Sequence, residues 1–200
     1  MAINQEDLSL LQEKITAIRY ELTPYMSYRN LVFNAEQMLE LLVALPVAIG
    51  INLDKKIDFF EERVLEHAAK TAAKFYNEQL NEETQELFES LVEPDETMND
   101  TIFVQDFKHE LRYLISSFSD FEAHWLKALE LFWGLEGLLK KYNPFMKSPQ
   151  KAFLETMYMI LLSNSGDDTI EIEQMKNIIS KLPMQVNDKD LEEIKNSLRP

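Results

Sequence analysis

The chain contains no cysteine among its 200 residues. This absence excludes a disulfide scaffold, a zinc site with thiolate ligands and a cysteine nucleophile. Stability must therefore come from a packed core, and apolar residues, at 46% of the composition, are numerous enough to build one. A chain of this length suits one domain, or one domain with a small appendage.

Glycine and proline are scarce, with four and seven residues respectively. No glycine-rich loop exists to cradle a phosphate, and no serine lies in a Gly-x-Ser-x-Gly elbow. Strand-type alternation is nowhere sustained, whereas apolar residues recur at steps of three or four. The sequence therefore predicts an all-α protein. We expect no enzyme activity, although two carboxylates brought together by folding would leave no sequence signature.

Long apolar runs are also missing. The longest uncharged stretch, Leu41–Leu53, contains Pro46 and Gly50 and is shorter than the roughly 20 residues that a membrane crossing needs. The first residues, MAINQEDLSLLQEK, carry acids where a secretory signal would carry a basic region. We therefore expect a cytoplasmic protein without a membrane partner.

Basic residues are few, with 20 Lys and Arg against 35 Asp and Glu, which gives a net charge of −15. Such a balance repels phosphate backbones and anionic membranes, so we expect no direct binding of nucleic acid. A protein partner with a basic surface fits this charge. The simpler interpretation is that the acidity only keeps the protein soluble.

No Lys or Arg at all occurs between Asn77 and Phe107. The same stretch holds ten acids, which we call the acidic run: Glu78, Glu82, Glu83, Glu86, Glu89, Glu93, Asp95, Glu96, Asp100 and Asp106. Like charges at helical spacing destabilise a helix slightly. A base-free stretch of this length therefore indicates that its negative charge has a function. We predict that the acidic run binds a partner. A solvated helix face followed by an acidic loop is the alternative.

One long apolar pattern is present, from Gln105 to Tyr142. Apolar side chains recur there at steps of three or four: Phe107, Leu111, Leu114, Phe118, Phe121, Trp125, Leu129, Phe132 and Leu135. A second apolar set widens this stripe in the later half, which is typical of a helix buried on several sides. Ser119 and Glu122 have the spacing of a capping box and predict a joint near Ser119.

Around this central segment, 105–142, the periodicity predicts a single bundle of about eight or nine helices. The first helix is expected to begin near Asn4, with an apolar stripe of Leu8, Leu11, Ile15, Ile18 and Leu22. Pro24 and Pro46 are expected to end the first two helices, and Ser27 to cap the second. Ser148 at the cap and Pro149 at the first helical position predict a later helix start. The other predicted helices cover approximately 54–75, 81–91, 150–162, 172–182 and 188–198. Residues 1–142 are predicted to form an acidic helical bundle. Residues 148–200 are predicted to form a C-terminal helical subdomain, packed on it as one compact unit.

The C-terminal stretch MYMILLSNSGDDTIEIEQMKNIISKLP places a loop rich in Asn, Ser, Gly and Asp between two helical patterns. It resembles the EF-hand family, with a loop from Ser163 to Gln174 and Ile170 at its buried eighth position. The resemblance implies calcium ligands at loop positions one, three, five and twelve, which here are Ser163, Ser165, Asp167 and Gln174. Only Asp167 is acidic, and Gln174 replaces the bidentate glutamate. The same pattern also looks like the tellurite-resistance TerB group of small helical domains.

The histidines offer a further alternative. Asp106 and His109 share one helix face, as do Asp120 and His124, so two such pairs on facing helices could supply four metal ligands. Our main expectation has no metal and no cofactor. It is a non-enzymatic acidic interaction module, an inhibitor or regulator that docks on a basic, nucleic-acid-binding protein. The alternative is a helical small-molecule or metal-binding domain with an EF-hand-like or TerB-like C-terminal segment.

Overall fold

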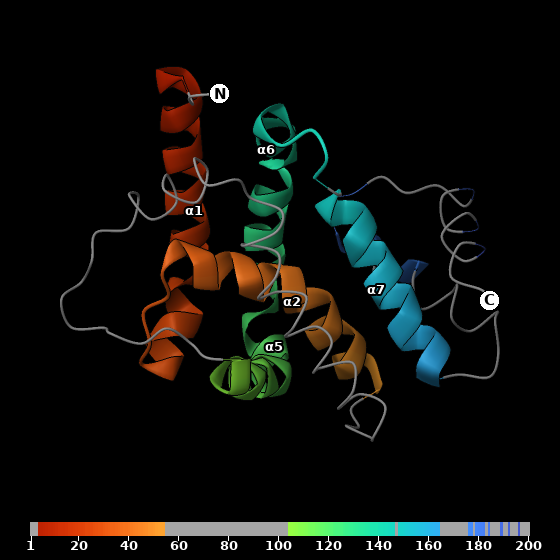
Figure 1. Ribbon diagram of the computed structural model, residues 1–200. Coiled ribbons are helices and arrows are strands. Elements are labelled where there is room, and N and C mark those ends of the chain that lie inside the picture. Colours follow the sequence, from red (N-terminus) through yellow and green to blue (C-terminus); the bar gives the residue numbers. More distant parts are fainter. Residues whose placement is uncertain are drawn as a thin grey trace.

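The computed structural model describes residues 4–54, 104–146 and 148–164, with a few single positions between 176 and 196 (Figure 1). Five helices lie within these residues: α1 (Gln5–Arg29), α2 (Ala35–Asp54), α5 (Val104–Trp133), α6 (Glu136–Tyr142) and α7 (Pro149–Asn164). No strand occurs among the described residues, so the all-α prediction is confirmed there. The predicted total of eight or nine helices is not confirmed, because 55–103 and most of 165–200 lie outside this part.

Helix α1 begins where the sequence predicts, because the Asn4 side chain accepts a hydrogen bond from the backbone N–H of Asp7 at 2.8 Å. The predicted end at Pro24 is wrong, since the helix continues to Arg29. A proline inside a helix costs roughly 3 kcal/mol. Beyond Pro24, however, the helix buries Tyr25 and Met26 in the core, and each buried side chain of this kind contributes roughly 1.5–3 kcal/mol.

Helix α2 does not start at Ser27, which lies inside α1. Its cap is Asn34, whose side chain accepts from the N–H of Gln37 at 2.8 Å, while the Gln37 side chain accepts from the N–H of Asn34 at 3.0 Å. Pro46 does not break α2, which continues to Asp54. Side chains on all sides of this helix are buried, so α2 shares the centre of the fold with α5: Met38, Leu39, Leu41, Leu42, Leu45 and Ala48.

Helix α5 continues through Ser119, so the predicted division into two helices at that residue is wrong. The interruption of the predicted central segment falls instead at Gly134 and Leu135, between α5 and α6. Even so, α5 changes direction along its length. Figure 1 shows its first part nearly end-on and its later part rising toward α6.

Helix α7 starts as the sequence predicts, with Ser148 at the cap and Pro149 at the first helical position. The Phe153 ring packs edge-on against Trp133, with centroids 5.3 Å apart. Helix α2 crosses α1 and α5 and reaches α7, and these contacts form one continuous apolar core (Figure 1). The boundary between residues 142 and 148 stays a prediction. None of the described helices is long and apolar enough to cross a membrane.

Candidate functional site

The structure describes the end of the acidic run and not its body. Asp106 lies in the first turn of α5. The other nine acids lie outside the described residues: Glu78, Glu82, Glu83, Glu86, Glu89, Glu93, Asp95, Glu96 and Asp100. What the structure positions is therefore the helix into which the acidic run leads.

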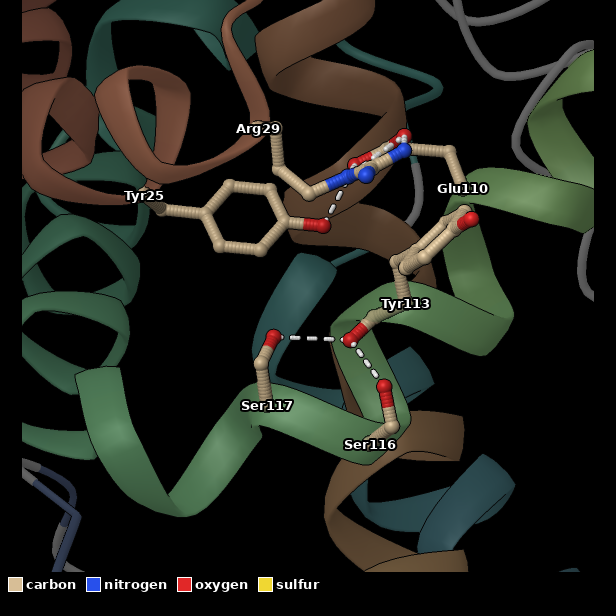
Figure 2. Close-up of polar contacts among 6 residues, drawn as sticks. All are labelled: Tyr25, Arg29, Glu110, Tyr113, Ser116 and Ser117. Carbon is tan, nitrogen blue, oxygen red and sulfur yellow. Dashed lines mark hydrogen bonds and ion pairs between the residues drawn. The ribbon is translucent and has the colours of Figure 1, made fainter.

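One turn after Asp106, a carboxylate of α5 is buried against α1. The Glu110 side chain is only 5% exposed. Its Oε1 accepts a hydrogen bond from the Tyr25 hydroxyl, and its two oxygens accept from Arg29 Nε at 3.1 Å and Arg29 Nη2 at 2.9 Å. Figure 2 shows Tyr25 and Arg29 reaching from α1 to this one carboxylate. The pairing of Arg29 with Glu110 is bidentate, which is the strongest geometry available to an arginine and a carboxylate.

Aromatic rings surround this contact. The Arg29 guanidinium lies over the Tyr113 ring, 3.4 Å from its centroid. The Tyr25 ring packs edge-on against Trp125 at a centroid distance of 4.9 Å. Tyr25 and Trp125 are fully buried, which strengthens the electrostatic attraction on their side of the contact, whereas Tyr113 is exposed. We call Tyr25, Arg29, Glu110 and Tyr113 the Glu110 cluster.

The protonation states of the Glu110 cluster follow from its burial. Burial raises the pKa of Tyr25, and the nearby Glu110 charge raises it further, so the phenol stays protonated and donates. Hydrogen bonding to Glu110 raises the pKa of Arg29, which keeps the guanidinium charged. Both carboxylate oxygens already accept hydrogen bonds from these two residues. The arrangement therefore suits holding α5 against α1 rather than taking a proton from a substrate.

A second polar contact joins the other end of α1 to α6. Asp7 Oδ2 accepts hydrogen bonds from Lys141 Nζ, from the Tyr142 hydroxyl and, at 3.0 Å, from the Asn4 amide. The hydrogen bond from Lys141 holds the pKa of Asp7 below its usual value, with a smaller contribution from Tyr142. The Lys141 side chain is 49% exposed, so water screens this contact. We call these four residues the Asp7 cluster.

Further carboxylates of the described part lie in ion pairs with bases of the same part. These pairs are Glu122 with Lys181 at 3.5 Å, Glu130 with Lys127 at 2.5 Å, Glu136 with Lys140 at 2.5 Å and Glu155 with Lys151 at 3.9 Å. Glu21 lies 3.1 Å from the Nδ1 atom of His124. We call the described helices α1, α2, α5, α6 and α7 the framework. Several of the carboxylates of the framework are thus paired with its own bases. The acidic run differs, because its own span contains no Lys or Arg.

The metal alternative gains no support from the described residues. His109 and His124 both lie on α5, so the two Asp–His pairs do not lie on facing helices. His109 packs edge-on against Tyr113, whereas His124 pairs with Glu21. In the described ranges no group of three His, Cys, Asp or Glu side chains could hold a metal ion. Of the EF-hand-like loop, only its first two residues, at the end of α7, are described.

Sequence reasoning missed the Glu110 cluster because Pro24 was taken as the end of the first helix. The signal was present, however. Continuing the buried stripe of α1 from Leu22 by three and then by four residues reaches Tyr25 and Arg29. The partner carboxylate on α5 is 81 residues from Arg29, and no local pattern indicates that pairing.

The Trp125 indole adds one more buried polar group to this region. Among the described residues, its Nε1 is the one buried side-chain nitrogen or oxygen without a hydrogen-bond partner. The Tyr25 ring packs edge-on against this indole, so Trp125 is one of the aromatic residues around the Glu110 cluster.

Comparison of the chain with protein-family models, with curated proteins and with solved structures finds no match.

Proposed function

We propose that this protein is a non-enzymatic interaction module that docks the acidic run on the basic surface of a partner protein. The partner proposed is a nucleic-acid-binding protein, because acids presented on helices can occupy sites meant for phosphates. The protein then acts as an inhibitor or regulator of that partner. The observation that carries the proposal is the base-free stretch of ten acids between Asn77 and Phe107.

The contrast with the described framework supports this reading. In the framework six carboxylates lie in ion pairs with Lys or Arg: Asp7, Glu110, Glu122, Glu130, Glu136 and Glu155. The acidic run lacks bases of its own for such pairing. Concentrated charge of one sign raises the association rate of an oppositely charged partner and makes binding depend on salt.

The test begins with a tagged chain, used to capture partners from the source cells and washed with increasing salt. The proposal expects a nucleic-acid-binding protein that modest salt releases and that its own DNA or RNA displaces. With that partner purified, reversing Glu82, Glu83, Glu86 and Glu89 to lysine is expected to weaken the affinity at least about tenfold. The helical circular dichroism is expected to stay unchanged.

A matched control separates the acidic run from net charge. Reversing Glu6, Glu13, Asp120 and Glu192, which are exposed residues outside the run, changes the net charge by the same amount. This control is expected to reduce binding much less than the reversal inside the run. Equal loss in both variants, or binding that the first reversal leaves intact, contradicts the proposal.

A further inference from the structure

The contacts of Tyr25 require α5 to bend. Its hydroxyl binds Glu110, and its ring lies 4.9 Å from the ring of Trp125. Glu110 and Trp125 are fifteen positions apart, and in a straight helix that separation is about 22 Å along the axis. One tyrosine side chain meets both, so the helix turns between them, as Figures 1 and 2 show.

Two serines account for the position of the bend. Ser116 Oγ and Ser117 Oγ both donate hydrogen bonds to the backbone carbonyl of Tyr113, at 2.9 and 2.7 Å (Figure 2). That carbonyl is the regular helical acceptor for the N–H of Ser117, so the hydroxyls compete with the backbone. Side chains that insert into the hydrogen-bond ladder in this way bend helices.

The part of α5 before the bend contacts α1 through the Glu110 cluster, and its Leu111 is buried in the core. Tyr25 and Arg29 bind Glu110, and Arg29 also lies over Tyr113, so all these contacts precede Ser116. After the bend, Phe121 and Trp125 pack on Tyr25, and His124 pairs with Glu21. Both parts of α5 thus contact Tyr25, but Arg29 contacts only the part before the bend and Glu21 only the part after it.

We infer that residues 104–113, which we call the arm, pivot at Ser116 and Ser117 and are latched to α1 by the Glu110 carboxylate. The arm begins at Val104, two residues before the last acid of the run, Asp106. The latch therefore acts on the described residues that follow the body of the acidic run in the sequence. Its effect on partner binding rests on the proposed function, whereas the latch itself does not.

Electron-spin distance measurements test the latch directly. The chain has no cysteine, so two introduced cysteines are the only sites that a thiol label can reach. The arm pair places labels at the exposed positions Thr16 and His109, and the framework pair places them at Thr16 and Ala123. Replacing Glu110→Gln keeps an acceptor for Tyr25 but removes the charge that holds Arg29.

In the unaltered protein we expect one narrow distance distribution for each pair. With Glu110→Gln, the distance distribution of the arm pair is expected to broaden or to gain a second maximum. The distance distribution of the framework pair is expected to stay narrow. The double change Ser116→Ala and Ser117→Ala is expected to move the arm pair to a new single distance, because the helix straightens. Unaltered arm distances in both variants overturn the latch and pivot.

If the Glu110→Gln protein loses its fold, both pairs broaden, and Arg29→Lys becomes the deciding variant. Lysine keeps the charge but lacks the bidentate fork, so a milder broadening of the arm pair alone is expected. Unchanged arm distances in that variant overturn the latch. Loss of partner binding in the Glu110→Gln chain, with arm distances changed, extends the inference to function. A failed capture experiment bears only on the proposed function.

Discussion

The two ends of α1 are fastened by the same kind of interaction in opposite environments. At its C-terminal end, the Glu110 cluster buries a carboxylate among aromatic rings, with three donor groups from two residues on its two oxygens. At its N-terminal end, the Asp7 cluster gathers three donors around one oxygen at the surface. Burial makes the first contact costly to break, because a lone charge left inside cannot be solvated. The second can exchange its partners for water at little cost.

The largest effect is expected from removing the buried carboxylate. Glu110→Ala leaves Arg29 without its partner and Tyr25 without its acceptor, so the free energy of unfolding is expected to fall by about 3–5 kcal/mol. Chemical denaturation followed by circular dichroism measures it. The control Glu130→Ala removes an exposed pair with Lys127 and is expected to cost at most about 1 kcal/mol. Similar losses in the two variants would show that burial does not distinguish the contacts.

A smaller effect is expected when only one donor is removed. Tyr25→Phe keeps the ring among its aromatic neighbours and deletes the hydroxyl that binds Glu110. Arg29 still pairs with the carboxylate, so the expected loss is roughly 1.5–3 kcal/mol, the range for a hydrogen bond to a charged group. The same denaturation experiment applies, with Tyr20→Phe, a highly exposed tyrosine of α1, as the control. A loss no larger than that of the control would mean that the hydroxyl contact adds nothing.

At the other end of α1, Asp7→Asn is expected to cost less than either change in the Glu110 cluster. The pKa of Asp7 is lowered in the folded protein, so folding is linked to its ionised form. The contribution of Asp7 is therefore present above its unfolded pKa, about 3.9, and is lost as the pH falls through the lower folded pKa. Unfolding free energies of the two proteins are expected to differ at pH 7 and to converge in acid. If the difference in unfolding free energy instead grows as the pH falls, the pKa of Asp7 is not lowered by folding.

The smallest effect is that of salt. At 1 M ionic strength charges are screened over about 3 Å, compared with about 10 Å at 0.1 M. Raising the salt between these values is expected to shrink the difference between the unaltered protein and Asp7→Asn. The difference produced by Glu110→Ala is expected to change less, because the Glu110 carboxylate is buried. Equal salt dependence of the two would mean that the Glu110 cluster is open to solvent.

Sequence patterns predicted the structure correctly where they depend only on residues close in the sequence. The helix start near Asn4, the apolar stripe from Leu11 to Leu22 and the Ser148-Pro149 helix start all occur as predicted. Proline was misleading twice, at Pro24 and Pro46, because burial of the residues that follow each proline offsets the lost hydrogen bond. The serines near residue 117 did mark a change in α5, but as a bend rather than as a helix end.

By itself, the sequence determined the all-helical character of the described part, since periodicity and the scarcity of glycine act residue by residue. It also determined the acidic run, which is a property of composition alone. Only the tertiary structure decided that Glu110 would be buried opposite Tyr25 and Arg29. Their meeting joins residues more than eighty positions apart, and no local pattern in the sequence indicates such a pairing.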